Sequence, residues 1–163
     1  MHTYTSIGVD EVGGDEATRD RDMARRGLVL VIEDNPHDWE IYGKILWYNG
    51  FDVIYAPDGA TGYDMVTRHH PDLILLDLGL PDMDGVELCA RLTKRNDERS
   101  IPIMILSGRP ARELEAAALE AGCVRYMEKP ALPLDVLHAV EELIGRPPPA
   151  GVGPTPKKHP PSA

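Results

Sequence analysis

Cysteine is scarce in this 163-residue sequence, which contains only two. Cys89 and Cys123 lack both the CxxC spacing and the accompanying histidines of a zinc or redox site, so we interpret them as buried free thiols. The six histidines are scattered along the chain, and the adjacent pair His69 and His70 precedes a proline at a predicted helix end. Cysteine and histidine are therefore poor candidates for metal ligands here.

Basic residues and long apolar runs are also in short supply. Lys and Arg number 17 against 27 Asp and Glu, which gives a formal net charge of −10. Nucleic-acid affinity comes largely from basic groups that displace counterions, so no nucleic-acid partner is expected. No apolar stretch approaches the roughly 20 residues that cross a bilayer, and the first residues lack the charged-then-apolar order of a signal peptide. We therefore expect a soluble, cytoplasmic protein without membrane insertion.

The composition divides the chain into three parts. Residues 1–27 are polar and punctuated by glycine, so they cannot offset the entropy of ordering by burial and are expected to form a flexible N-terminal arm. Residues 146–163 form a proline-rich tail that is expected to be disordered. The remaining segment, 28–145, has the size of one domain, for which roughly 100 to 150 residues is typical.

Within this segment, short continuous runs of Val, Ile and Leu alternate with longer amphipathic stretches, a pattern typical of a parallel sheet covered by helices on both faces. Strands are predicted near residues 28–32, 52–55, 72–76, 102–106 and 124–127. Helices are predicted from Pro36 to before Gly50, over 58–70, 84–95 and 111–121, and from Pro133 onward. Five such units predict an α/β, doubly wound, flavodoxin-like fold with strand order 2-1-3-4-5.

Two of these helices carry predicted inward faces. In the first helix we expect Ile41, Ile45 and Leu46 to point into the core. In the last helix the corresponding residues are Leu134, Leu137, Val140, Leu143 and Ile144.

Polar side chains follow four of the five predicted strands. Glu33 and Asp34 follow the first, Asp77 the third, Ser107 the fourth and Lys129 the last. Ligands of doubly wound sheets bind beside the carboxyl ends of the strands, at the point where the winding reverses, here between strands one and three. Three crowded carboxylates repel one another, so either their pKa values rise or a cation lies among them. Hard oxygen ligands favour Mg²⁺, which also takes a phosphate oxygen.

This set of groups permits phosphoryl transfer. Asp77 could attack phosphorus and form an aspartyl phosphate. Lys129 would neutralise charge on the transferred group, and Ser107 would donate a hydrogen bond to it. Taken singly, each side chain has an ordinary explanation, such as a helix-dipole partner, a turn residue or a surface lysine. Their convergence on one crevice favours the functional interpretation.

Four segments resemble the signature of response-regulator receiver domains: Val31-Ile32-Glu33-Asp34-Asn35, the stretch from Asp77 to Gly85, Leu106-Ser107-Gly108 and Lys129-Pro130. The resemblance covers about residues 28–145. It implies that Asp77 is the phosphoacceptor. It also implies that Mg²⁺ (or Mn²⁺) binds Glu33, Asp34, Asp77 and the backbone carbonyl of Gly79. Glu33 stands where the family commonly has aspartate.

The same resemblance assigns the remaining roles. Lys129 would pair with the phosphate, Ser107 and Tyr126 would form the switch, and the Lys129–Pro130 bond would be cis. The phosphodonor would be a sensor histidine kinase or a histidine phosphotransfer protein. The output would be the surface of helix 111–121, strand 124–127 and the last helix, read by a downstream protein target. The protein would not be an enzyme, although it assists its own aspartyl phosphorylation and dephosphorylation. Because the flanking segments are short and polar, we expect a stand-alone response regulator.

Other functions remain to be weighed. A receiver-like scaffold could bind partners without being phosphorylated. A magnesium-dependent phosphatase of the haloacid-dehalogenase type would need a second acid two positions after the nucleophile, where this chain has Gly79. A flavin-binding flavodoxin-like protein would need a phosphate loop after the first strand, where Glu33 and Asp34 would instead repel phosphate.

Overall fold

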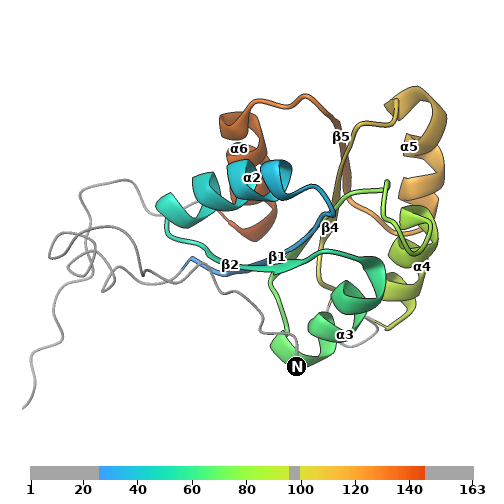
Figure 1. The fold of residues 1–163 in the computed structure, drawn as a ribbon, viewed down its shortest axis with the longest axis horizontal. Coiled ribbons are helices and arrows are strands. Elements are labelled where there is room, and N and C mark those ends of the chain that lie inside the picture. The colour runs from blue at the N-terminus through green and yellow to red at the C-terminus, as the bar shows by residue number, and fades with distance from the viewer. Residues whose placement is uncertain (1–25, 96–99, 146–163) are drawn as a thin grey trace, which may run out of the picture.

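The computed structural model describes residues 26–95 and 100–145 (Figure 1). The predicted tail and residues 1–25 of the predicted arm lie outside the described residues. Arg26, at the end of that arm, donates its backbone N–H to the carbonyl of Gly50 and pairs with Glu141 at 2.9 Å. Its guanidinium also lies 4.4 Å from the centre of the Phe51 ring. Arg26 therefore packs against the folded domain.

The strands form one parallel sheet. They are β1 (Leu28–Ile32), β2 (Asp52–Ala56), β3 (Leu73–Leu76), β4 (Ile103–Ser107) and β5 (Arg125–Glu128). Their order is β2-β1-β3-β4-β5, and each neighbouring pair is parallel. All four residues of β3 and all five of β4 are buried, as expected of central strands covered on both faces. The predicted fold class and strand order are confirmed.

In the described part of the chain, five helices cover this sheet. They are α2 (Pro36–Tyr48), α3 (Gly59–His69), α4 (Gly85–Arg95), α5 (Ala111–Glu120) and α6 (Pro133–Ile144). Figure 1 shows α2 and α6 on one face and α3, α4 and α5 on the other. Each face has its own apolar cluster, and the strands contribute alternate residues to the two clusters. None of the helices within the described ranges is long and apolar enough to span a membrane.

The start of α2 follows the predicted capping pattern. The side chain of Asn35 accepts a hydrogen bond from the backbone N–H of His37, and Pro36 occupies the first turn. The chain therefore leaves β1, passes through Glu33 and Asp34, and enters a helix within three residues. This tight connection keeps the acidic pair at the edge of the sheet.

The predicted inward orientation was wrong for two residues. Ile41 is 49% exposed and Leu134 is 56% exposed. Helix α2 packs through Tyr42 and Leu46, which lie one turn apart, and Ile41 lies about 100° around the axis from Tyr42. Helix α6 packs through Val136, Leu137, Ala139 and Val140, and Leu134 faces away from that group. The two cysteines are buried and free, as predicted.

Candidate functional site

Backbone hydrogen bonds hold the polar residues just beyond the ends of the strands. The N–H of Glu33 donates to the carbonyl of Ala56 at 3.0 Å, and the N–H of Asp77 donates to Ile32 at 2.9 Å. On the other side of the sheet, the N–H of Lys129 donates to the carbonyl of Ser107 at 2.8 Å. These bonds extend the ladders of the sheet past the regular strands. The backbone at Glu33, Asp77 and Lys129 is therefore fixed by the sheet itself.

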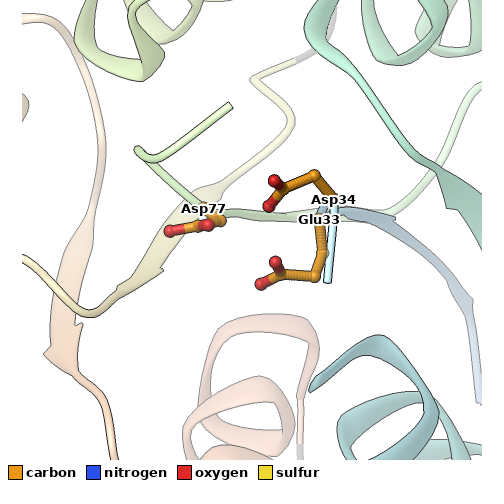
Figure 2. A group of neighbouring side chains, drawn as sticks. All are labelled: Glu33, Asp34 and Asp77. Atoms are coloured by element: carbon orange, nitrogen blue, oxygen red, sulfur yellow. The ribbon is translucent and has the colours of Figure 1, made fainter. Parts of the chain in front are cut away.

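Three carboxylates meet at this edge. Glu33, Asp34 and Asp77 each offer an oxygen atom, and these atoms all lie within 4.8 Å of one another. Figure 2 shows the side chains of Glu33 and Asp34 leaving the backbone in different directions, with both carboxylates on the side of Asp77. Glu33 and Asp77 are 4% and 8% exposed, whereas Asp34 is open to solvent. An all-oxygen set with one solvent-facing member is well suited to a hard divalent cation that keeps several waters.

Burial makes the charged form of Glu33 costly. Desolvation raises the pKa of Glu33 to about 7, and the charge of Asp77 acts in the same direction. Hydrogen bonds from Lys129 and from the backbone N–H of Asn35 oppose the rise only in part. The positive charge near these carboxylates therefore does not fully offset their burial, and a bound cation would stabilise their charged forms further.

Lys129 is the ammonium group of the site. Its Nζ atom donates to Glu33 Oε2, lies 2.8 Å from Asp38 Oδ2 and lies 3.9 Å from Asp77 Oδ2. Burial acts to lower the pKa of Lys129, but the hydrogen bonds to Asp38 and Glu33 outweigh it and hold that pKa above its ordinary value. Lys129 is therefore charged at neutral pH and close to Asp77 without being hydrogen-bonded to it. The Lys129–Pro130 peptide bond is cis, as predicted.

Ser107 and Tyr126 both bond to the backbone of Arg109. The Oγ atom of Ser107 accepts from the Arg109 N–H at 3.3 Å, and the Tyr126 hydroxyl donates to the Arg109 carbonyl at 2.9 Å. Ser107 is 1% exposed and Tyr126 is 9% exposed. Burial raises the pKa of the Tyr126 phenol, so the hydroxyl keeps the proton that it donates.

These groups line one open cleft of about 350 Å³. The lining residues are Glu33, Asp34, Asn35, Asp38, Asp77, Gly79, Ser107, Gly108, Arg109 and Lys129. A Cβ atom added to Gly79 would lie 3.4 Å from a carboxylate oxygen of Asp77, so this glycine borders the acceptor directly. The structure thus brings together all the residues predicted for metal binding and phosphoryl transfer. Tyr126 is not among the lining residues, and it is connected to the cleft through the Arg109 carbonyl and through its side-chain contact with Ser107.

Asp38 was missed by the sequence analysis. It lies in the first turn of α2, four residues after Asp34. That spacing, together with the cap at Asn35, places a residue of the first helical turn beside the acidic pair, and it is the signal that could have identified Asp38.

Comparison with known proteins identifies the family. The model of the response regulator receiver domain matches residues 29–141 of this chain. The chain belongs to the response regulator receiver domain family. Receiver domains are signalling domains rather than enzymes, and the family generally binds Mg²⁺ at an acidic pocket. The cluster of Glu33, Asp34 and Asp77 fits that ion, because its donor atoms are all oxygen and lie close together.

Curated relatives of this receiver domain include two mycobacterial proteins. Response regulator MprA from Mycobacterium sp. (strain KMS) is 33% identical over 118 residues, which are 72% of this chain and 47% of that protein. Response regulator MprA from Mycobacterium avium (strain 104) is 34% identical over 118 residues, 72% of this chain and 48% of that protein. The chain spans about half the length of these curated relatives.

Solved structures agree with this assignment. A response regulator receiver domain protein (CheY-like) from Methanospirillum hungatei JF-1 matches with a TM-score of 0.67 and 26% identity, over 72% of this chain and 92% of that chain. The chemotaxis response regulator CheY4 of Vibrio cholerae matches with a TM-score of 0.66 over 71% of this chain and 97% of that chain. At 22% identity, the second match shows the fold alone.

Proposed function

We propose that this receiver domain accepts a phosphoryl group on Asp77 from the phosphohistidine of a sensor histidine kinase or a histidine phosphotransfer protein. The observation that carries the proposal is the position of the Asp77 carboxylate. It lies within 4.8 Å of two other carboxylates and 3.9 Å from the Lys129 ammonium, in the lining of an open cleft. An acceptor carboxylate, a place for a divalent ion and a nearby positive charge are therefore present together.

The proposed reaction is a transfer between a nitrogen and an oxygen atom. A carboxylate oxygen of Asp77 attacks phosphorus, the new O–P bond forms, the N–P bond breaks, and the imidazole nitrogen of the donor keeps the electron pair. Glu33, Asp34, Asp77 and the Gly79 carbonyl are the proposed ligands of Mg²⁺ or Mn²⁺. A bound ion would screen the charge of the phosphoryl oxygens. Lys129 would bind one of those oxygens, and Ser107 would donate a hydrogen bond to another.

The proposed output is a change of surface shape. Ser107 would rotate toward the phosphoryl group and give up its contact with the N–H of Arg109. The β4–α5 loop would then shift, and with it the hydrogen bond between Tyr126 and the Arg109 carbonyl. The ring of Tyr126, which is already buried, would change its packing, and this would alter the surface of α5, β5 and α6. We propose that a downstream protein target binds this altered surface.

Mass measurement tests the acceptor directly. The protein is incubated with Mg²⁺ and acetyl phosphate, and its intact mass is compared with that of an Asp77→Asn variant treated in the same way. We expect the wild type to gain one phosphate and the variant to gain none. Omitting Mg²⁺ or adding a chelator should abolish the gain. An unmodified wild type, or equal modification of both proteins, would count against the proposal and favour a scaffold that is not phosphorylated.

A further inference from the structure

Asp38 and Lys129 form an ion pair that joins α2 to the end of β5. The Asp38 Oδ2 atom lies 2.8 Å from Lys129 Nζ, while Asp77 Oδ2 lies 3.9 Å away. The side chain of Lys129 is 13% exposed and that of Asp38 is 29% exposed, so the pair is largely shielded from water. In this state the ammonium is hydrogen-bonded to Glu33 and Asp38 but not to the acceptor carboxylate.

The position of Asp38 is set by a rigid helix start. The N–H of Trp39 donates to the carbonyl of Asn35 at 3.2 Å, and the side chain of Asn35 caps the first turn. The N–H of Asn35 in turn donates to Glu33 Oε1 at 2.9 Å. Glu33 and Asp38, the two hydrogen-bond partners of Lys129, are therefore oriented by the same turn. The β1–α2 connection therefore positions both carboxylates for their hydrogen bonds with the Lys129 ammonium.

We propose that Asp38 is a positioning residue that holds the Lys129 ammonium on the α2 side of the cleft and competes for it with a phosphoryl group arriving at Asp77. This inference rests on the proposed function of Asp77 as the phosphoacceptor. An ammonium has three N–H donors, and Glu33 and Asp38 occupy two of them. At its present distance of 3.9 Å Lys129 makes no hydrogen bond to the Asp77 carboxylate, and in this proposal it turns from Asp38 toward a phosphoryl oxygen bound there.

The competition predicts that removing the Asp38 carboxylate affects phosphorylation of Asp77 and hydrolysis of the aspartyl phosphate differently. The ion pair is made before phosphorylation and is weakened once the ammonium turns to the phosphoryl group. Removing it raises the free energy of the unphosphorylated protein alone. Phosphorylation should therefore become faster, whereas hydrolysis of the phosphorylated protein, which starts after Lys129 has moved, should change little.

The test compares wild type with Asp38→Ala by measuring the second-order rate constant for phosphorylation by acetyl phosphate with Mg²⁺, and the hydrolysis rate after donor removal. We expect phosphorylation to become about fivefold faster, which corresponds to about 1 kcal/mol. Hydrolysis should stay within about twofold. Asp38→Glu should restore most of the wild-type rate. A matched control is Glu40→Gln, which removes one negative charge from the same helix without touching Lys129, because Glu40 pairs with Lys44.

Measurements at high salt distinguish the contact between Asp38 and Lys129 from long-range electrostatic effects of net charge. At about 0.5 M salt, where the Debye length is only about 4 Å, effects of distant charge are screened, and the Asp38→Ala acceleration should persist. Slower phosphorylation of Asp38→Ala, or an equal acceleration by Glu40→Gln, would overturn the inference.

A metal-free measurement distinguishes the failure of this inference from the failure of the proposed function. In ¹⁵N-lysine NMR spectra recorded with chelator, the Lys129 ammonium of the wild type should exchange its hydrogens slowly, and Asp38→Ala should exchange them at least about fivefold faster. Equal exchange in the two proteins overturns the positioning role even if Asp77 is phosphorylated. A wild type that takes up no phosphate overturns the proposed function and the competition with it, even if the ion pair itself is confirmed by NMR.

Discussion

The hydroxyl of Tyr126 donates a hydrogen bond of 2.9 Å to the backbone carbonyl of Arg109, the residue whose N–H bonds to Ser107 at 3.3 Å. One peptide segment of the β4–α5 loop therefore connects a buried ring in β5 to a buried hydroxyl in the cleft. A movement of Ser107 can reach Tyr126 through this segment without any change in the sheet.

Tyr126→Phe removes the hydrogen bond to Arg109 and keeps the ring. We expect the free energy of unfolding to fall by about 1 kcal/mol, measured by urea denaturation, because a partly buried hydrogen bond is lost. The matched control is Tyr42→Phe, since Tyr42 is also buried and donates to the Ala131 carbonyl at 3.2 Å on the other face of the sheet. Both variants should lose similar stability. Only Tyr126→Phe should shift the backbone NMR signals of the β4–α5 loop, and unchanged loop signals would contradict the connection.

Ser107→Ala tests the role of Ser107 in the connection between the cleft and Tyr126. This variant should still be phosphorylated, because Asp77 and the acidic cluster are untouched, but phosphorylation should change the NMR spectrum of the α5, β5 and α6 surface much less than in wild type. Ser107→Thr keeps a hydroxyl at this position and should restore the larger change. The coupling role of Ser107 fails if the phosphorylated and unphosphorylated spectra of Ser107→Ala differ as much as those of wild type.

The order of the strands could be predicted because continuous Val, Ile and Leu runs report burial on both faces, and right-handed crossovers then leave few arrangements. The exposed faces of the helices were harder to predict. Ile41 and Leu134 are apolar, but the actual inward direction of each helix is set by its best-packed turn, through Leu46 in α2 and Val140 in α6. The apolar character of a residue alone does not show whether a position beside the buried face of a helix is itself buried.

The site was predictable where it depends on strand ends and less so where it depends on helices. Asp77 directly follows the apolar strand β3 and Lys129 directly follows β5, so the sheet alone brings them to one edge. Asp38 reaches the site only through the orientation of the first turn of α2, which depends on the cap at Asn35 and on how α2 packs against the sheet. The order of residue types in the sequence does not determine how the first turn of α2 is oriented relative to the sheet.

Glu33 should make stability depend on pH. Its folded-state pKa of about 7 exceeds the ordinary value of 4.5, so between these pH values the native state binds more protons than the unfolded state. This contribution to the free energy of unfolding is complete below the lower value and is lost as pH rises through the higher one. Glu33→Gln cannot titrate, so its stability relative to wild type should rise by about 3 kcal/mol across the window. Urea denaturation with chelator at several pH values measures this, and a pH-independent difference would contradict it.

Even the smallest side chain at position 85, in place of Gly85, should destabilise the fold. It begins α4, and a Cβ atom there would lie 2.5 Å from the Cα atom of Leu78 and 3.0 Å from the carbonyl oxygen of Asp77. Both contacts are with backbone, so Gly85→Ala must push α4 away from the segment that carries the acceptor. We expect a loss of about 2 kcal/mol in the free energy of unfolding and a slower reaction with acetyl phosphate. In Gly108→Ala the added methyl group meets nothing within 4 Å, so that control should change stability by less than about 0.5 kcal/mol. Equal losses in the two variants would show that the approach of α4 to Leu78 is not what makes glycine necessary at Gly85.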